Sequence, residues 1–563
     1  MQSIRWRDTG FFLLLVAAVI LICLALSTTR WRIDLTGDKR YTLSTQAKQL
    51  LEKMDDVAFV RVYLDGDMPV DMRKLQRAIG DMLGDLRSYS GGNIQYEFFN
   101  PAEITSQKEK ADLYRELYRK GVLPYVLQEK NSEGGVTQME LFPAALITMN
   151  GQQHAVNFLQ QNQAISQEEN INNAIQNLEY SLVDAIDMLS RTERKKIAFI
   201  EGHDELSGQQ VADVTRDLSA YYTVNRVLLQ GRVNALDGYD VAIVAKPRKP
   251  WDEVDKLAVD QFIMRGGKVA WFLDEVVVHE DSLANGYLTF GLPGSHNLDD
   301  MLFRYGVRLN QNVVQDLQCA LIPVNVSPAG MPAKFSPMPW TYYPLLTASS
   351  SSPITRSLNM VKAEFPGTID TLENAAVRKQ ILLTSSQYSL VKSAPFSVSL
   401  QQVTENVNPQ LYNKQYASVA VLLSGQFSSI FRNRPIEKYN NGKKFPFIEQ
   451  SSDNQQIVVA DGDIIRNDVL NSGNVFPLGY DRYTKQILYG NKDFVRNVVS
   501  CLTDDNDLMQ LRSKVITLRM LDRARVVRER TFWIVVNTVV PLVVLAVGGV
   551  AFVYYRKKKY GKK

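Results

Sequence analysis

Two long apolar runs without charged residues lie near the ends of the chain, one within Thr9–Thr29 and one within Thr531–Tyr555. A helix needs roughly 20 apolar residues to cross a bilayer core of ~30 Å, and both runs are long enough. We therefore predict transmembrane helices at 10–29 and 531–555, with short tails at 1–9 and 556–563. The first run has an alternative reading as a cleaved signal peptide, although no small-x-small cleavage site follows it.

The first unit between these spans, 30–165, has the pattern strand, helix, strand, helix and hairpin. That order, with Pro143 before the hairpin, is similar to the thioredoxin-like fold, in which a cis proline precedes the penultimate strand; another small α/β unit is the alternative. The segment 65–72, where the redox motif would lie, has no cysteine, which excludes thiol–disulfide chemistry. The expected elements are a helix capped by Ser44 and running to about Met54, a strand at Val57–Leu64, a helix at Asp71–Tyr89, a strand at Ile94–Phe99, a helix at 104–120, and a hairpin at Leu141–Phe158 that turns at Asn150-Gly151.

A polar helix at 166–192 leads into a second unit at 193–513, where unbroken apolar strands alternate with helices. This pattern predicts a Rossmann-like parallel sheet covered on both faces. A Ser-, Pro- and Thr-rich stretch, about 316–416, reads as a β-rich insertion, and 514–530 reads as a basic helix that continues into the second span. The expected sheet strands are Lys195–Ile200, Thr223–Leu229, Tyr239–Ala245 and Lys268–Leu273, with Ala417–Leu423, Gln456–Ala460 and a helix at Asp493–Leu502 completing the unit.

The net charge of +4 is concentrated in the tails. Residues 1–8 carry +1 and the tail after Tyr555 carries +6, so 4 − 1 − 6 leaves −3 for 9–555. This acidic middle argues against nucleic-acid binding. The basic tail argues for cytoplasmic termini, although Arg30, Arg32, Lys39 and Arg40 after the first span and the five arginines before the second make the local charge count nearly even. That charge rule applies to short loops, and long domains cross the membrane largely regardless of charge. We expect 30–530 to be periplasmic, held at the inner membrane.

Motifs for common chemistry are absent from the sequence. It contains no P-loop, no H-E-x-x-H, no G-x-S-x-G and no paired C-x-x-C. Its four histidines are scattered, which argues against a structural zinc site. One of the three cysteines, Cys23, lies in the first span, and the sequence leaves open whether Cys319 and Cys501 are bonded. We predict no enzyme activity, no cofactor and no metal.

Polar side chains gather where three predicted parallel strands end. Ligands of open parallel sheets bind beyond the carboxyl ends of the strands. These residues therefore form either a polar crevice that binds a small ligand or a docking partner, or they are simply polar residues of solvent-exposed loops. In the second case His203 helps to cap the next helix. The turn Asp461-Gly462-Asp463 resembles a fragment of a calcium loop, but such turns are more often simply tight. The candidate ligand-binding residues are Glu201, His203, Asp204, Glu205, Lys246, Arg248, Asp274 and Glu275.

Five arginines in the basic segment before the second span form a second candidate site. They either grip anionic lipid headgroups or form the solvated face of a helix that packs on a partner protein. The partner-facing residues are Arg519, Arg523, Arg525, Arg528 and Arg530.

Three motifs carry a resemblance to a known family. They are IDLTGDKRYTLS (Ile33–Ser44) after the first span, FIEGHDEL (Phe199–Leu206) after a buried strand, and GNKDFVRNVVSCLTDDNDLMQLRSK (Gly490–Lys514) before a basic helix and a Pro-containing span. Over essentially its whole length the chain resembles GldG, the gliding-motility-associated auxiliary or "substrate-binding" component of an ABC transporter in Bacteroidota. The second motif usually reads G-H-G-E, so Asp204 departs from it.

The resemblance implies a partnership with an ABC-2-type permease and its cytoplasmic ATPase, and a link to gliding motility or envelope export. It also implies that the second unit is similar to class I glutamine-amidotransferase-like domains without their catalytic residues. The leading hypothesis is a non-enzymatic periplasmic subunit anchored by both spans. The alternatives are a ligand-free envelope scaffold and a membrane-tethered envelope hydrolase that uses Glu201, His203 or Asp274 for acid–base chemistry.

Overall fold

The computed structural model describes residues 42–560, apart from thirteen short stretches, together with Leu14, Ala17 and Ala18. The larger of two compact units comprises Tyr41–Lys514, and α12 (Arg530–Tyr560) belongs to the other. The predicted first span and most of the basic segment lie outside the described residues. The stretches left out are 131–135, 160–165, 192, 280–281, 284–287, 328–330, 333, 406, 437–444, 471, 485, 505–507 and 514–527.

The first part of the larger unit contains a mixed four-stranded sheet in the order β2-β1-β5-β6. β1 runs parallel to β2 and antiparallel to β5, which forms a hairpin with β6. The elements follow the predicted order, but a further hairpin, β3–β4, was not predicted. The bounds are α2 (Thr45–Glu52), β1 (Ala58–Val62), α3 (Val70–Tyr89), β2 (Ile94–Phe98), η1 (Pro101–Glu103), α4 (Gln107–Arg119), β3 (Tyr125–Lys130), β4 (Val136–Leu141), β5 (Ala144–Met149) and β6 (Gln152–Asn157).

Local sequence signals explain several of these boundaries. The hydroxyl of Ser44 accepts a hydrogen bond from the Ala47 amide at 3.1 Å and so caps α2, as predicted. Asn150 and Gly151 both have positive φ, which suits the tight turn between β5 and β6. Within the described chain the only cis peptide bond joins Ala394 and Pro395, so Pro143 follows a trans bond, unlike the thioredoxin-like pattern.

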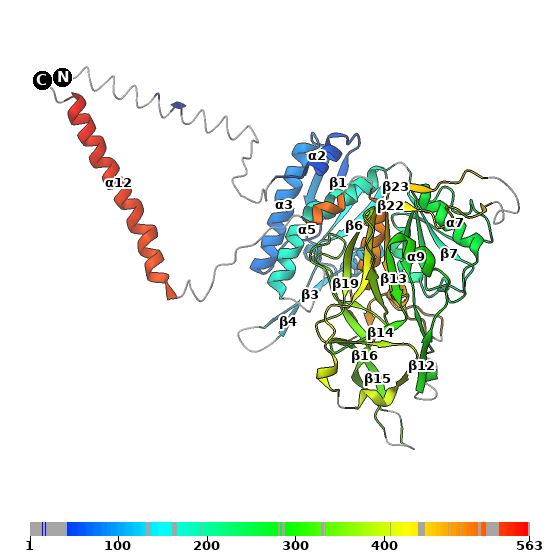
Figure 1. Ribbon diagram of the computed structural model, residues 1–563. Coiled ribbons are helices and arrows are strands. Elements are labelled where there is room, and N and C mark those ends of the chain that lie inside the picture. The colour runs from blue at the N-terminus through cyan, green and yellow to red at the C-terminus, as the bar shows by residue number, and fades with distance from the viewer. Residues whose placement is uncertain are drawn as a thin grey trace. The chain divides into compact units, whose positions relative to one another are not determined.

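The helix α5 (Gln167–Ser190) packs beside α3 and joins the two parts of the larger unit (Figure 1). Its N-terminus has a capping box in which Ser166 and Glu169 bond each other's amides. Ile171, Leu178 and Leu182 are buried in the same core as the inner face of α3, which makes α5 part of the first sheet's cover.

The second part contains a ten-stranded mixed sheet in which β8-β7-β9-β10-β23 are parallel. The prediction of a parallel sheet is confirmed for these five strands. Beyond them the sheet continues antiparallel through β22, β19, β16 and β15, so part of the stretch predicted as an insertion extends the same sheet. The sheet strands are β7 (Lys196–Glu201), β8 (Thr223–Leu228), β9 (Val241–Ala245), β10 (Lys268–Phe272), β15 (Cys319–Asn325), β16 (Phe335–Ala348), β17 (Val361–Lys362), β19 (Val377–Thr384), β22 (Ser418–Ser428) and β23 (Gln450–Val459).

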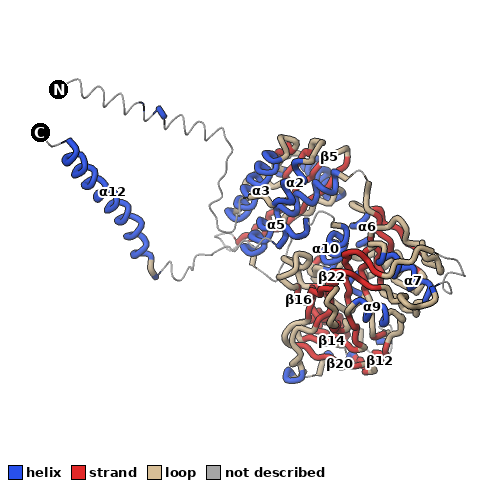
Figure 2. The backbone as a smooth tube through the Cα atoms, turned by 45° about the horizontal axis from the view of Figure 1, so that its top comes forward, coloured by secondary structure: helices blue, strands red, loops and turns tan. Residues whose placement is uncertain are grey.

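Helices cover both faces of the parallel strands, as their unbroken apolar sequences require. Alternate residues of β9 enter two cores: Val241 and Ile243 join the core with α6 and α10, whereas Ala242 and Val244 join the core with α7 and α9. Figure 2 shows α6 and α10 next to each other beside the sheet. The helices are α6 (Ala212–Ser219), α7 (Glu253–Met264), α9 (Asp299–Tyr305) and α10 (Asn491–Thr503).

The remaining strands form small sheets, most of them in the β-rich lobe around β15 and β16 (Figure 1). Tyr342 and Trp340 of β16 are buried there in a small aromatic core with Phe365 and Val398. Short 3₁₀ turns complete the unit. The bounds are β11 (Val276–Val278), β12 (Leu288–Pro293), β13 (Val307–Asn310), β14 (Asn312–Asp316), β18 (Thr368–Thr371), β20 (Ser389–Ser393), β21 (Phe396–Ser399), β24 (Tyr480–Asp481), β25 (Gln486–Ile487), η2 (Leu400–Val403), η3 (Pro409–Leu411), η5 (Asp463–Ile465) and η6 (Leu508–Ser513).

In the part of the chain that is described, α12 is the one helix long and apolar enough to cross a membrane. Its large apolar side chains are exposed, and Pro541 lies inside it. The prediction of a second span is therefore supported by length and composition.

Candidate functional site

Side chains from four neighbouring strands meet at the carboxyl edge of the parallel sheet. Because β7, β9, β10 and β23 run in the same direction, the residues that follow them all lie at this edge. Lys246 follows β9, Asp274 follows β10 and Asp461-Gly462-Asp463 follow β23. The centre of the edge is an ion cluster, and the predicted residues divide between this cluster and its two flanks.

Lys246 forms the centre of this ion cluster. Its Nζ lies 2.7 Å from Asp274 Oδ2 and also contacts Asp463 Oδ2, with 18% of the lysine side chain exposed. Burial disfavours the ammonium, but Asp274 and Asp463 outweigh this effect and raise the pKa of Lys246. A protonated amine with two carboxylate partners is not a nucleophile, so this lysine is unsuited to covalent catalysis.

The backbone around Lys246 is adapted to this position. Lys246 has φ +54°, a left-handed conformation that is uncommon for a residue with a side chain. A Cβ on Gly462 would lie 2.5 Å from Lys246 Cβ, so only glycine fits at this point of close approach. The Gly462 amide in turn donates to Asp274 Oδ1 at 2.5 Å. The chain thus accepts backbone strain to place the ammonium between the carboxylates.

Asp461 closes the turn and links it to the β-rich lobe. One oxygen accepts from the Asp463 amide at 2.7 Å and the other from the Glu364 amide at 2.8 Å, which makes 461–463 the tight turn expected from its sequence. Burial, reinforced by the neighbouring carboxylates of Asp463 and Asp274, raises the pKa of Asp461 well above its ordinary value.

A second layer of ion pairs supports the first. Arg466 Nε lies 2.5 Å from Asp463 Oδ1, its guanidinium also contacts Glu364, and Lys362 Nζ is 2.7 Å from the other oxygen of Glu364. Although burial opposes the ionisation of Glu364, Lys362 and Arg466 lower its pKa to about 2. Acidic and basic groups alternate through both layers, so the network neutralises itself.

Three carboxylates that lie close together suggest a cation site, and this geometry is present. Ligand oxygens of Asp274, Asp461 and Asp463 all lie within 4.8 Å of one another. Carboxylate sets of this kind suit Mg²⁺ or Ca²⁺. Here the Lys246 ammonium lies against two of the three carboxylates and supplies the positive charge that a metal would bring.

His203 is the centre of the first flank and is fully engaged within the protein. Its Nδ1 lies 3.1 Å from Glu205 Oε1 and its Nε2 lies 3.2 Å from Asp255 Oδ2 in the first turn of α7. Its ring stacks on Trp251 at 4.1 Å, and only 5% of the residue is exposed. His203 thus ties the loop after β7 to α7, and it does not cap the next helix, α6, as the alternative reading proposed.

The charge of His203 follows from its two carboxylate partners. Burial lowers its pKa, but the hydrogen bonds to Asp255 and Glu205 outweigh burial and raise the pKa to about 9. The ring is therefore a cation at neutral pH, with both nitrogens donating. An imidazolium with both protons committed in this way is a poor general base.

The remaining predicted residues of the edge are not part of one crevice. Glu201 pairs with Arg226 of β8, whereas Asp204 and Arg248 point to solvent. Asp204 has φ +61°, which explains why glycine suits this position of the motif and why aspartate, a residue that tolerates this conformation, can replace it.

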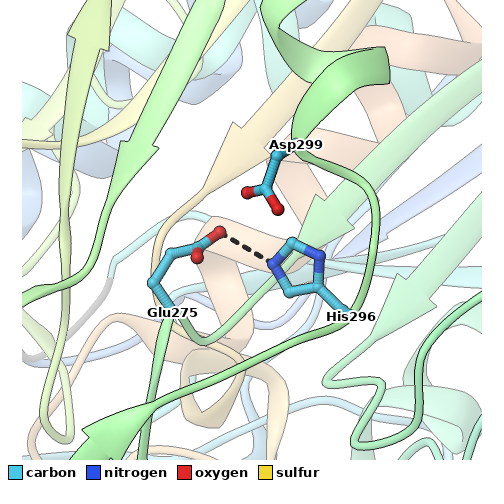
Figure 3. A group of neighbouring side chains, drawn as sticks. All are labelled: Glu275, His296 and Asp299. Atoms are coloured by element: carbon cyan, nitrogen blue, oxygen red, sulfur yellow. Dashed lines mark hydrogen bonds and ion pairs between the residues drawn. The ribbon is translucent and has the colours of Figure 1, made fainter.

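Glu275 forms the second flank with His296 and Asp299 (Figure 3). The Leu298 amide donates to His296 Nδ1 at 3.1 Å, so Nε2 carries the proton and donates to Glu275 Oε1 at 2.7 Å. A metal needs an unprotonated nitrogen, and neither nitrogen of this tautomer is free to bind one. The geometry therefore favours a buried hydrogen bond over a metal centre.

Sequence reasoning found Lys246 and Asp274 but not their main partners. Asp463 and Asp461 were recognisable, because an acidic turn directly follows a strand assigned to the same sheet. Glu364 and Arg466 had no local signal, since the fold brings them together from a β-rich stretch and a turn 102 positions apart.

The structure describes only two of the five candidate arginines, Arg528 and Arg530. Arg519, Arg523 and Arg525 lie outside the described residues, and Arg528, 76% exposed at its side chain, is 4.0 Å from Glu529. Arg530 begins α12. Within the described residues neither Cys319 nor Cys501 forms a disulfide.

The structure is that of a mixed α/β protein. The charged side chains at the carboxyl edge of its parallel sheet mainly form ion pairs with one another. A family model described as "ABC-type uncharacterized transport system" matches residues 194–498, more than half of the chain. The chain belongs to this family of ABC transporter auxiliary proteins. Membership suggests a transport-associated subunit that acts with other transporter components and is not itself an enzyme.

Other comparisons add little to this assignment. A second model, for a domain of unknown function (DUF7088), matches residues 37–148. No curated protein matches the chain. Among solved structures, one titled "mmIFT52 N-terminal domain" is 12% identical with a TM-score of 0.32, covering 55% of this chain and 99% of that one.

Proposed function

We propose that this protein is a non-enzymatic, doubly membrane-anchored subunit of an ABC-2-type transport system of the GldG type. In this proposal it holds a large periplasmic unit over the permease and its ATPase, with both termini in the cytoplasm. Its role is to couple the permease to periplasmic partners or substrate during gliding motility or envelope export. The membership of 194–498 in an ABC transport family, in one polypeptide with α12, is the observation that carries the proposal.

The strand-end edge is consistent with a role that needs no catalysis. Lys246 of the ion cluster and His203 of the first flank are both cations held by carboxylates. An envelope hydrolase would need a free base or nucleophile at this edge, and neither residue is available. The same pairing favours the ligand-free scaffold as the second candidate, because the charges of the edge are already satisfied within the protein.

The strand orders of the two sheets support our proposal that the larger unit contains a thioredoxin-like domain and a Rossmann-like domain. The order β2-β1-β5-β6, with β5 antiparallel to its neighbours, supports a thioredoxin-like domain without redox cysteines, whereas the trans bond before Pro143 departs from that pattern. The parallel strands β8-β7-β9-β10-β23 with helices on both faces fit a Rossmann-like, class I glutamine-amidotransferase-like domain. In this proposal the thioredoxin-like domain spans 30–165, the connecting helix 166–192 and the Rossmann-like domain 193–513.

The test is affinity purification of the full chain from its native membranes in mild detergent, with mass spectrometry of bound proteins. We expect a permease and an ATPase at near-stoichiometric amounts. The matched control replaces 530–560 with an unrelated apolar helix, which keeps an anchor but should reduce recovery of the permease. Recovery of the chain alone, or only with unrelated envelope proteins, would contradict the transporter assignment and favour the scaffold.

A further inference from the structure

The short helix η6 is anchored in both parts of the larger unit. It spans Leu508–Ser513, and residues 514–529 connect it to α12. The side chains of Leu508 and Leu511 are buried in the core of the first part, together with residues of α3 and α5. Met509, which lies between them, is instead buried in the core of the second part, together with residues of α6 and α10. One short segment therefore contacts both cores.

Hydrogen bonds fix both ends of η6. The two carboxylate oxygens of Asp504, the residue that ends α10, accept from the amides of Leu508 at 3.0 Å and Met509 at 2.7 Å. At the other end, the guanidinium of Arg512 donates to the Arg356 carbonyl at 2.8 Å, and the guanidinium of Arg356 donates to the Arg512 carbonyl at 3.1 Å. Arg356 lies between β16 and β17. These bonds tie η6 to α10 and to the β-rich part of the sheet.

η6 lies where the first part of the larger unit contacts the second. Tyr180 of α5 packs against both cores, and the guanidinium of Arg512 lies 5.3 Å from the centre of its ring. This distance is within the range of a cation–π contact. The two parts also meet at His154 of β6 and Tyr221, which follows α6, because their rings are 4.7 Å apart. Withdrawal of η6 would therefore remove apolar contacts from both sides of this boundary.

The N-terminal connection enters the larger unit differently. The residues that follow the predicted first span lead into α2, whose buried side chains Ala47 and Leu51 belong to the core of the first part. A packed element moves with the side chains that it contacts, because protein interiors are close-packed. A displacement that arrives through α2 therefore acts on the first part, whereas one that arrives through η6 acts on both parts at once.

We propose that η6 is the junction through which a displacement of α12 reaches both parts of the larger unit and changes their arrangement. The inference rests on the proposed function, in which the permease moves α12, and deepens it by naming where this movement enters the larger unit. Leu508 and Met509 are adjacent in the chain but lie in different cores, so neither can be displaced without the other. A pull on the end of η6 thus loads both cores together.

The first test asks whether η6 couples the two parts, by hydrogen exchange and mass spectrometry of the full chain in lipid nanodiscs. Met509→Ala truncates a side chain of the second core. We expect amide exchange in α3 and α5 to become roughly tenfold faster or more, because a detached η6 also withdraws Leu508 from the first core. The matched control is Leu382→Ala, at a buried residue of the second core on β19, which should leave α3 and α5 unchanged.

The reciprocal variant tests the same coupling from the first core. Leu508→Ala should accelerate exchange in α6, whereas Leu86→Ala, at a buried residue of the first core on α3, should not. If Met509→Ala affects the second part alone and Leu508→Ala the first part alone, the two side chains are independent core contacts and the proposed junction is overturned.

The second test asks whether α12 acts through η6, in the complex purified with its permease and ATPase. We expect ATP to change amide exchange in η6 and α5 several-fold. A Gly-Ser insertion of about twelve residues after Lys514 adds slack with a mean span of roughly 20 Å and should abolish this change. The same insertion between Gly37 and Asp38, on the N-terminal connection, should preserve it.

The outcomes separate this inference from the proposed function. If the permease is recovered but ATP leaves exchange in η6 and α5 unchanged, or if the change survives the insertion after Lys514, the junction is overturned while the proposed function stands. Absence of the permease from the purification would remove the proposed function and with it the movement of α12. The exchange of Met509→Ala and Leu508→Ala would then still decide whether η6 couples the two parts.

Discussion

The raised pKa of His203 makes the stability of the larger unit depend on pH in a defined window. His203 is 5% exposed and lies between Glu205 and Asp255, and its pKa is about 9 in the folded chain. An unfolded histidine titrates near pH 6.5. Because the folded pKa is the higher one, the imidazolium stabilises the fold fully below about pH 6.5, and this contribution is lost as pH rises through about 9.

The magnitude follows from the difference between these two pKa values. A rise from about 6.5 to about 9 corresponds to about 3 kcal/mol at roughly 1.4 kcal/mol per unit. Over this window we expect the free energy of unfolding to fall by that order. His203→Gln should remove most of the dependence, because glutamine cannot take the charge, and should itself destabilise the fold at pH 6.5. An exposed histidine, His279, provides the control as His279→Gln.

The chain's four histidines make a direct assay practicable. Selective ¹³C labelling of histidine in the full chain gives few resonances, and each variant assigns one of them. The His203 signal should titrate near pH 9, and that of His154, whose pKa is lowered to about 4 by burial and then by Arg496, should not titrate above pH 6. A His203 midpoint near 6.5, or denaturant stability that is flat between pH 6.5 and 9, would refute the reasoning.

Three further predictions follow from the edge and the thiols. Gly462→Ala should lower the free energy of unfolding by about 1 to 3 kcal/mol, because the new Cβ would meet Lys246 at 2.5 Å, whereas Gly208→Ala, which meets nothing within 4 Å, should change it little; denaturant unfolding of both tests this. Lys246→Met should cost about 3 to 5 kcal/mol, because it leaves buried carboxylates without their counter-ion, and a loss below 1 kcal/mol would contradict the ion-pair geometry. Cys319, whose pKa is raised to about 11 by burial and Asp316, and the buried Cys501 should both resist alkylation at pH 7.5 until the chain unfolds. A disulfide-linked peptide in a non-reducing digest would contradict the absence of a disulfide between them.

Elements whose sequence patterns are long and periodic could be predicted from the sequence. α5 (Gln167–Ser190) lies within the predicted range 166–192, because its N-cap serine and the period of its apolar residues indicate the same helix. The strands β7, β9 and β10 were also predictable, since each is an unbroken apolar run of the length that a covered sheet requires. Their shared edge followed from topology, so the meeting of Lys246 and Asp274 could be expected.

Long-range pairing in the β-rich stretch could not be predicted in the same way. β16 and β19 carry mixed polar and apolar residues and join the main sheet antiparallel, a register set by tertiary packing. The hairpin β3–β4 was missed because its strands are short and polar. Glu364 lies at the edge because β17, which precedes it, pairs with β16. The second layer of the ion network therefore could not be predicted from the sequence.

The edge network explains how this unit keeps its β-rich part fixed to its parallel sheet. Buried ion pairs contribute little net stability when complete, yet breaking one is costly, so they specify an arrangement more than they stabilise it. Here a series of ion pairs joins the ends of β9 and β23 to the strand β17. It runs from Lys246 through Asp463 and Arg466 to Glu364 and Lys362. A cluster that binds a small charged ligand would leave some of these charges unpaired in the absence of the ligand. A cluster that fixes the β-rich part to the parallel sheet would pair them within the protein. The pairing therefore favours a structural role for the edge, in which it holds the ends of β9 and β23 to β17.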